Sequence, residues 1–464
     1  MVDRKLYTSG NKSSKRMNKE EVLKKVKEED IETIRFVYVN ANGLISNKSW
    51  NVKYFEDAVE EGVKIFPGNY FLAYSYGIPP NSKFKISSSD IYLKPDLDTF
   101  TVLPFSSKTA RVMGYFYERD GRPWECDSRG ILRKTIERCN VNGFKIVSAG
   151  ELEFYLLRVE NGVPKLMFEP EQSLPYTTYA HHVVEPLLQD FTSHLWKMGT
   201  HVTRIVREGG PSQYELNIKQ KEGVSAADDI VSLREAIRSI SFNHGLCATF
   251  MPRPFQEHLG NGMHIHQSLY DTTTGKNVFI DPEDKRNYGL SETCYHYIGG
   301  ILEHAKALTA ICAPTANSYK RLVPGTVSVD AIAYGPENRG AAIRIPSERN
   351  EIGTESARIE FRIPDPAANP YLVLACIVAC GLQGIDEKID PGNPMTNNKI
   401  VTGKKNLLPR SLAEAIDALK RDKIIRSAIG EQLFSEFIKL KEYEWDLYSS
   451  NVTPWERRTY LEAF

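Results

Sequence analysis

The chain has 464 residues, 41% of them hydrophobic and 25% charged, which is typical of a globular protein with two or three domains. Its 59 basic residues balance its 59 acidic residues, so no overall positive field favours nucleic-acid binding. No apolar run is long enough to span a membrane, and the polar N-terminus lacks the apolar core of a secretory signal. Seven dispersed cysteines favour free thiols in a reducing compartment. We therefore expect a cytoplasmic protein with no membrane or nucleic-acid partner.

The predicted elements divide the chain into a tail and two domains. The polar, basic residues 1–20 are expected to be a mobile tail. Short strands and turns, with one helix over 53–63, predict a small α+β domain over 21–115. Residues 116–464 are expected to form a larger domain of strands and long helices. These helices are predicted over 128–140, 183–197, 226–244, 295–310 and 371–380.

Four short stretches of the larger domain carry polar residues at every second position. Because successive side chains of a strand point to opposite faces, each stretch predicts one apolar and one polar face. The polar faces would carry Glu151 and Glu153; Gln213, Glu215 and Asn217; His264, His266 and Ser268; and Arg358, Glu360 and Arg362. An ordinary solvent-exposed sheet is the alternative, but such faces mostly carry Lys, Thr and Ser. We therefore expect a curved sheet with a polar concave surface.

The chemistry of this predicted surface points to bound cations and phosphate. Crowded carboxylates repel each other unless cations lie between them. Glutamate and histidine suit Mg²⁺ or Mn²⁺, and the absence of cysteine from the cluster argues against a structural zinc ion. Arginines on a neighbouring strand suit phosphate and carboxylate groups. Together these features indicate phosphoryl transfer, although the chain has no Walker or dinucleotide-binding loop.

A set of motifs gives the chain a resemblance to the glutamine synthetase superfamily from about residue 32 to Trp455 and Glu456. The motifs lie at 151–154, 208–215, 249–254, 260–266, 317–325, 338–339, 343–346 and 358–370, and their order and spacing are highly specific. The resemblance implies an α+β fold with a small N-terminal β-grasp domain. It also implies a large catalytic domain with a curved antiparallel sheet flanked by helices. The family assembles as stacked rings, so a dodecamer with active sites between adjacent subunits is expected.

The resemblance also implies roles for individual residues. One metal ion would lie on Glu153, Glu208 and Glu215, and a second on Glu151, His264 and Glu360. The nucleotide and its γ-phosphate would be faced by His266, Ser268, Arg339, Arg344 and Arg358. The amino-acid substrate would be held by Arg321, Arg362 and the backbone of Gly260. Direct catalytic roles would fall to Arg339, Glu360 and Arg321.

The implied reaction has two steps. The γ-carboxylate of glutamate attacks the γ-phosphate of ATP, while two or three Mg²⁺ or Mn²⁺ ions and the arginines stabilise the transferring group. An amine then attacks the γ-glutamyl phosphate and expels phosphate. The acyl phosphate must be shielded from water, and residues 324–336 are expected to form the shielding loop.

The chain departs from ammonia-using glutamine synthetases where those enzymes handle ammonium. Residues 65–76 contain no acidic residue, Val327 stands at the place of a flap glutamate, and Leu259 replaces an asparagine. An ammonium pocket needs negative charge, so we expect an apolar amine such as aniline or a small alkylamine. An alkylamine would need a base such as Asp330. The expected amine pocket consists of Phe66, Tyr70, Phe71 and Val327, and the resemblance narrows to γ-glutamylanilide and γ-glutamyl-alkylamide synthetases.

Two other functions stay open at this point. One is an ordinary ammonia-using glutamine synthetase. The other is a non-catalytic structural or regulatory relative, which would be expected to lose metal ligands or arginines first. Because all six expected ligands are present, catalysis is favoured. The sequence leaves open which amine is used and whether the acid is glutamate or a close analogue.

Overall fold

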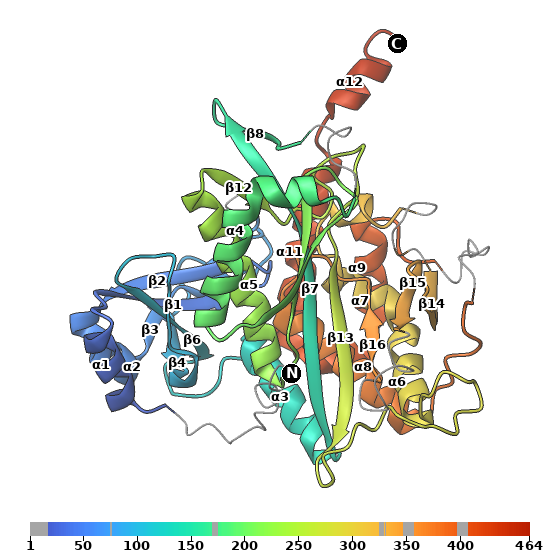
Figure 1. Cartoon of the computed structure of the whole chain (residues 1–464), viewed down its shortest axis with the longest axis horizontal. Helices are drawn as coiled ribbons and strands as arrows, with labels where there is room; N and C mark the ends of the chain where they lie inside the picture. The colour runs from blue at the N-terminus through green and yellow to red at the C-terminus, as the bar shows by residue number, and fades with distance from the viewer. Residues whose placement is uncertain are drawn as a thin grey trace.

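The computed structural model describes residues 17–74, 77–168, 175–323, 329, 331–346, 357–396 and 407–464. Within them the chain forms two β-sheets with flanking helices, and Figure 1 shows the smaller sheet to one side of the larger one. The predicted α+β class, with a small N-terminal β domain and a larger domain built on a curved sheet, is confirmed.

The N-terminal sheet is mixed and has six strands. Their order is β2-β1-β6-β4-β3, with β5 paired to β6, and β1 runs parallel to β6. The strands are β1 (Thr33–Val39), β2 (Ile45–Asn51), β3 (Val63–Ile65), β4 (Ile91–Pro95), β5 (Thr101–Val102) and β6 (Thr109–Tyr117). The flanking helices are α1 (Lys19–Glu28) and α2 (Phe55–Glu61). A capping box between Asn18 and Glu21 starts α1 inside the predicted tail.

The catalytic sheet has ten strands around one long central strand, β7 (Phe144–Glu160). The order is β14-β15-β16-β13-β7-β10-β9, and β8, β11 and β12 also pair with β7. Its other strands are β8 (Val163–Leu166), β9 (Val202–Arg207), β10 (Gln213–Ile218), β11 (Lys221–Glu222), β12 (Leu246–Thr249), β13 (Met263–Asp271), β14 (Ala331–Pro336), β15 (Ala341–Ile345) and β16 (Ile359–Phe361). All the pairings are antiparallel except β14 with β15.

Helices cover the apolar side of this sheet and form a bundle beside it (Figure 1). They are α3 (Ser128–Val141), α4 (Thr178–Lys197), α5 (Val224–Asn243), α6 (Glu292–Glu303), α7 (Ala305–Cys312), α8 (Pro370–Glu387), α9 (Leu412–Arg421), α10 (Lys423–Ile429), α11 (Glu431–Ser449) and α12 (Pro454–Tyr460). Asp127, rather than the predicted Ser128, caps α3. The helix predicted over 295–310 is divided at His304 into α6 and α7.

Helix α8 is the buried helix that the sequence predicts. Among the described residues it alone is long and apolar enough to cross a membrane, but 78% of it is buried inside the protein. It packs against α3, α6 and α10. The approach to α6 depends on glycine, because a Cβ atom at Gly300 would lie 2.1 Å from the carbonyl oxygen of Cys380.

Candidate active site

Strand pairing brings the predicted polar residues together on one face of the catalytic sheet. Glu153 on β7 lies opposite Glu215 on β10, and Glu151 on β7 lies opposite His264 on β13. The alternate residues on these strands and on β16 have no exposed surface: Leu152, Phe154, Tyr214, Leu216, Ile265, Ile359 and Phe361. The predicted division of each strand into a polar and an apolar face is therefore confirmed.

The polar face continues across the next strands of the sheet. His266 on β13 lies opposite Glu360 on β16, which in turn lies opposite Arg344 on β15. Two groups of possible ligand atoms result, each with all its atoms within 4.8 Å of one another. They are Glu151, Glu215 and His264, and Glu151, His266 and Glu360. Glu151 thus belongs to both groups, and His266 belongs to one of them. The family resemblance instead assigns Glu151 to one metal ion only and His266 to the nucleotide.

We call the polar face around Glu151, Glu153, Glu208, Glu215, His264 and Glu360 the cup. Its geometry suits a small, hard cation. His264 is buried, and its Nδ1 has no hydrogen-bond partner within the described part of the chain. That nitrogen lies 3.7 Å from a carboxylate oxygen of Glu151 and 3.7 Å from one of Glu360. An Mg²⁺ ion with octahedral donors at about 2.1 Å holds adjacent donors roughly 3.0 Å and opposite donors roughly 4.2 Å apart, so the distances of 3.7 Å lie within the range that such an ion spans. The residues present therefore fit Mg²⁺ or Mn²⁺.

Three carboxylates of the cup, Glu208, Glu215 and Glu360, have perturbed pKa values. Burial, followed by the charge of Glu151, raises the pKa of Glu215 well above its ordinary value. Burial and the charge of Glu153 raise the pKa of Glu208 to about 7. Burial opposes ionisation of Glu360, but the charges of Arg362 and the neighbouring histidines hold its pKa at about 2. The charges of Arg339 and Arg204 act on Glu208 and Glu215 but do not offset burial and the neighbouring carboxylates, an arrangement that a bound cation would relieve.

Arginines border the cup on the side of β15 and β16. Arg362 and Arg344 both form ion pairs with Glu360, and Arg344 also pairs with Glu337 at 2.8 Å. Arg321 is buried and donates to the carbonyl oxygens of residues 363 and 362, at 2.9 and 3.1 Å. Arg339 is exposed.

Two cavities open beside the cup and divide the predicted substrate residues between them. A cavity of about 440 Å³ is lined by Glu151, Arg204, Asn217, His266, Ser268 and Arg358, among others, and thus contains three of the five residues predicted to face ATP. A smaller cavity of about 90 Å³ is lined by Gly260, Arg321 and Arg362, the three predicted glutamate ligands. Its other lining residues include Glu153, Glu208, His264, Arg253, Leu259 and Arg339. We call these the nucleotide cavity and the acid cavity.

The predicted amine pocket does not form as expected. Tyr70 and Phe71 are fully buried and pack in edge-to-face contact with Trp124 at ring-centroid distances of 4.9 and 6.2 Å. The Tyr70 hydroxyl also accepts a hydrogen bond from the Ser128 N–H. Both rings are core residues with no surface left for an amine, so the prediction is wrong for this pair. Phe66 is half-buried, and Val327 lies outside the described residues, as does Asp330.

Arg207 is a functional candidate that the sequence reasoning missed. Its side chain is buried, and its Nη1 donates to the carbonyl oxygens of Glu208, Gly210 and Gln213 at 2.5, 2.6 and 2.8 Å. One guanidinium thus fixes the loop that carries Glu208. The only feature of the sequence that could have indicated this role is the position of Arg207 directly before Glu208.

Gln213 is a second residue without an assigned role. Its Nε2 donates to the Gly260 carbonyl and to Oδ1 of Asn261, both at 3.0 Å. Its Oε1 accepts from the Gly210 N–H at 3.0 Å. Gln213 therefore joins the loop of Glu208 to the wall of the acid cavity.

Comparisons with known proteins agree with this geometry. Residues 125–460 match the glutamine synthetase catalytic domain. The glutamine synthetase of Methanocaldococcus jannaschii is 38% identical, over 96% of this chain and 98% of that protein. The enzyme of Thermotoga maritima is 37% identical, over 96% of this chain and all of that protein. A solved ADP complex of GmaS, a γ-glutamylmethylamide synthetase, is 29% identical with a TM-score of 0.85, over 95% of this chain and 99% of that one. The chain therefore belongs to the glutamine synthetase family and is an ATP-dependent ligase of that family.

Proposed function

We propose that this ligase phosphorylates the γ-carboxylate of glutamate with ATP and then transfers the γ-glutamyl group to an apolar amine. The observation that carries the proposal is the convergence of Glu151, Glu215, His264 and Glu360 beside arginines on one face of the sheet. Carboxylates for metal ions next to guanidinium groups for phosphate are the parts that phosphoryl transfer requires. The use of ATP and divalent metals in the family supports the same chemistry.

The proposal assigns a role to each group of residues in the site. Glu151, Glu153, Glu208, Glu215, His264 and Glu360 hold two or three Mg²⁺ or Mn²⁺ ions, which offset the charge of the γ-phosphate. His266, Ser268 and Arg358 bind the nucleotide in the larger cavity. Arg321, Arg362 and the backbone of Gly260 orient glutamate in the acid cavity. Arg339 and Arg344 stabilise the negative charge of the transferring phosphoryl group.

Two sequence differences from ammonia-using enzymes, one of them in the acid cavity, support an amine other than ammonium. Leu259 lines this cavity, and no acidic residue occurs in 65–76. A protonated amine desolvated beside an apolar wall is costly, whereas an arylamine is neutral near pH 7 and needs no carboxylate to become a nucleophile. Phe66 and Val327 remain the proposed contacts. The structural similarity to GmaS also supports a substituted amine.

Ammonia is the second candidate nucleophile, because the relatives that are 37–38% identical are named glutamine synthetases. ADP formation with glutamate, Mg²⁺ or Mn²⁺ and a panel of aniline, isopropylamine and ammonia separates the two. We expect faster turnover with an apolar amine. Fastest turnover with ammonia would overturn the apolar-amine assignment, and no turnover with any amine would overturn the ligase itself.

Two further measurements test the finer parts of the proposal. Val327→Glu should weaken the use of apolar amines, and unchanged kinetics would place the pocket elsewhere. The family forms oligomeric rings, and we propose a dodecamer for this chain. Light scattering coupled to size exclusion measures the mass directly. A smaller assembly would contradict the dodecamer, and a monomer with full activity would contradict an active site shared between subunits.

A further inference from the structure

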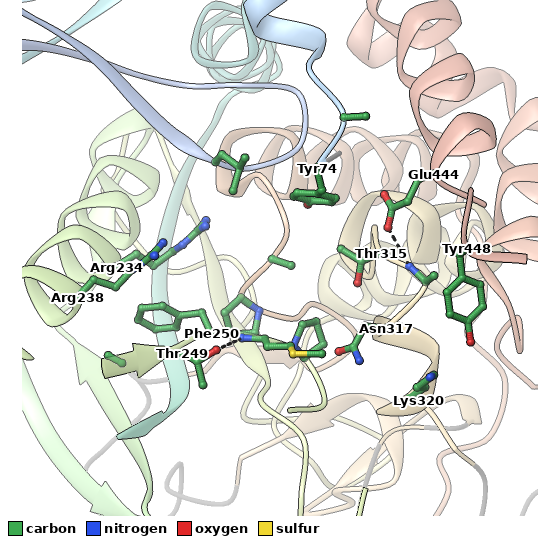
Figure 2. Close-up of a pocket in the computed structure, with 18 of the residues that line it drawn as sticks. Tyr74, Arg234, Arg238, Thr249, Phe250, Thr315, Asn317, Lys320, Glu444 and Tyr448 are labelled. Atoms are coloured by element: carbon green, nitrogen blue, oxygen red, sulfur yellow. Dashed lines mark hydrogen bonds between the residues drawn. The ribbon is translucent and has the colours of Figure 1, made fainter. Parts of the chain in front are cut away.

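A large cavity lies outside the candidate active site, where the two domains meet. Its volume is about 780 Å³, within the range of sites for small organic molecules. Figure 2 shows Arg234 and Arg238 on one side, Tyr74 above, and Thr315 and Glu444 on the opposite side. None of the residues predicted for the metal, ATP or glutamate sites lines it. We call it the junction cavity.

The charges that face the junction cavity are mostly positive. Arg234, Arg238 and Lys320 line it, and none of the three forms an ion pair within the described part of the chain. Glu444 is the single lining carboxylate, and it is already bonded to the Lys441 ammonium and to the Ala316 N–H, both at 3.1 Å. The cavity therefore has an excess of positive charge that an anion would offset.

Hydrogen bonds hold Arg234 in a fixed orientation on the side of the junction cavity that also carries Arg238. It is 7% exposed and donates to the carbonyl oxygens of Gly43 and Ala368 at 2.8 and 3.2 Å. Burial, and to a smaller extent the charge of Arg238, lowers the pKa of Arg234 to about 10. The fully buried Asp365 acts on Arg234 from outside the cavity lining, and burial raises the pKa of Asp365 to about 6.

The rest of the lining is largely apolar. It includes Leu44, Ala73, Phe250, Met251, Pro252 and Leu447, with the rings of Tyr74 and Tyr448 (Figure 2). A small inorganic anion would leave the apolar lining exposed to water, whereas a molecule with an apolar body would cover this lining. The lining thus fits an organic anion better than phosphate.

The segment around Pro252 separates the junction cavity from the acid cavity. Asn317 lines the junction cavity and makes two hydrogen bonds with the backbone of Arg253, from its N–H at 2.7 Å and to its carbonyl at 3.1 Å. Arg253 lines the acid cavity. The Pro252 carbonyl accepts from the Asn261 N–H at 2.7 Å, next to Gly260. A molecule that contacts Pro252 and Asn317 is therefore separated by a single residue, Arg253 or Asn261, from the acid cavity and its proposed glutamate ligand Gly260.

We propose that the junction cavity binds a small monocarboxylate with an aromatic or branched aliphatic body, and that this binding strengthens the binding of glutamate. The carboxylate pairs with Arg238 and Arg234, and the apolar body covers Phe250 to Pro252. Contact with Asn317 then braces the 250–253 segment that forms the wall of the acid cavity. The coupling is reciprocal, so glutamate strengthens binding of the monocarboxylate by the same factor.

Cys247 provides a reporter of occupancy when it is combined with Phe250→Ala, which should also weaken protection, because Cys247 and Arg238 line a neighbouring cavity as well whereas Phe250 lines only the junction cavity. Cys247 is partly exposed, whereas the other six cysteines are buried. Benzoate should slow the reaction of the full-length protein with a thiol reagent in a saturable manner, and Cys247→Ser should remove the protected thiol. Arg238→Gln should weaken protection by about tenfold, because one charge-assisted contact is lost. Arg410→Gln removes an exposed arginine elsewhere and is the matched control.

Any one of three results would contradict the binding site. The first is that benzoate does not protect Cys247, and the second is that it protects Cys247 equally in the unmodified protein and in Arg238→Gln. The third is that Cys247 is unreactive in the assembled protein and becomes reactive when the subunits dissociate. The last outcome would mean that a neighbouring subunit fills the cavity.

The effect on glutamate rests on the proposed function, whereas protection of Cys247 does not. Benzoate should lower KM for glutamate by about fivefold with little change in kcat, and Arg238→Gln should remove this effect. An unchanged KM with protection intact would refute the coupling alone. A rise in KM that persists in Arg238→Gln would show benzoate competing in the acid cavity and would refute the proposal.

Discussion

Buried and half-buried carboxylates occur in two regions of this protein, and the two regions differ in the positive charge that the chain places beside them. At the junction of the domains, Arg129 bonds Asp96 at 2.8 Å and Asp228 at 3.0 and 2.8 Å. On the catalytic sheet, burial and neighbouring negative charge instead raise the pKa values of Glu208 and Glu215. In the first region one arginine of the chain pairs with both carboxylates. Among the described residues Glu208 and Glu215 form no ion pair, and this difference separates a structural ion-pair network from a proposed metal site.

The largest effect should come from Glu360→Ala. This change removes a proposed metal ligand and leaves Arg344 and Arg362 without their shared carboxylate. We expect ADP formation to fall by at least about 1,000-fold, because both metal binding and the order of the arginines are lost. Steady-state kinetics measure the effect, and circular dichroism checks the fold. Glu222→Ala, an exposed position on β11 of the same sheet, should keep full activity. Normal turnover in Glu360→Ala would remove this residue from the site.

The polar cup was predictable because it depends on a local rule. Alternation along β7, β10, β13 and β16 assigns each residue to a face without knowledge of the rest of the fold. The grouping of ligands was not predictable, because it depends on register between strands. The sequence does not say that Glu151 lies opposite His264 while Glu153 lies opposite Glu215.

Other differences arise where tertiary packing decides. Tyr70 and Phe71 occupy the place in the sequence that suggested an amine pocket, but the aromatic cluster around Trp124 buries them. Arg207 ends a strand with one other charged residue, Arg204, and resembles a surface position in the sequence, yet its side chain is buried and donates to three carbonyls of the following loop. The apolar periodicity over 295–310 continues through His304, where hydrogen bonds to Asp422 and Gln383 mark the boundary between two helices.

Arg129→Met tests the region in which an arginine pairs with two aspartates. Asp96 and Asp228 would keep their largely buried positions without a guanidinium partner. We expect stability to fall by about 3–4 kcal/mol, because removing one partner of a buried ion pair leaves uncompensated charge. The fall should appear as a lower Tm in calorimetry, with metal affinity unchanged. Adding Asp228→Asn should recover part of the loss. An unchanged Tm would mean that solvent screens these carboxylates.

Arg207→Met tests how the metal region is held in place. Without Arg207 the carbonyls of Glu208, Gly210 and Gln213 lose their common donor, so Glu208 becomes less well positioned. We expect Mn²⁺ affinity in titration calorimetry to fall by about 10–100-fold, as for other groups that orient metal ligands. Arg158→Met, on the exposed end of β7, is the control. Equal Mn²⁺ affinity with a lower Tm would limit Arg207 to a structural role.

The smallest effect concerns His304, which, like Arg129, pairs with an aspartate of the chain itself. Its Nδ1 lies 2.6 Å from an Asp422 carboxylate oxygen and its Nε2 lies 2.7 Å from Oε1 of Gln383, so both nitrogens donate when the ring is an imidazolium. Burial lowers its pKa, but the hydrogen bond and charge of Asp422 outweigh this, and the net pKa is raised. A raised pKa stabilises the folded state fully below the unfolded value of about 6.5, and the contribution is lost as pH rises through the folded value. His304→Gln should therefore cost about 1 kcal/mol near pH 6 and progressively less at higher pH, measured as the difference in Tm from the unmodified protein. A difference that grows with pH would show that the neutral ring, rather than the imidazolium, makes these two bonds.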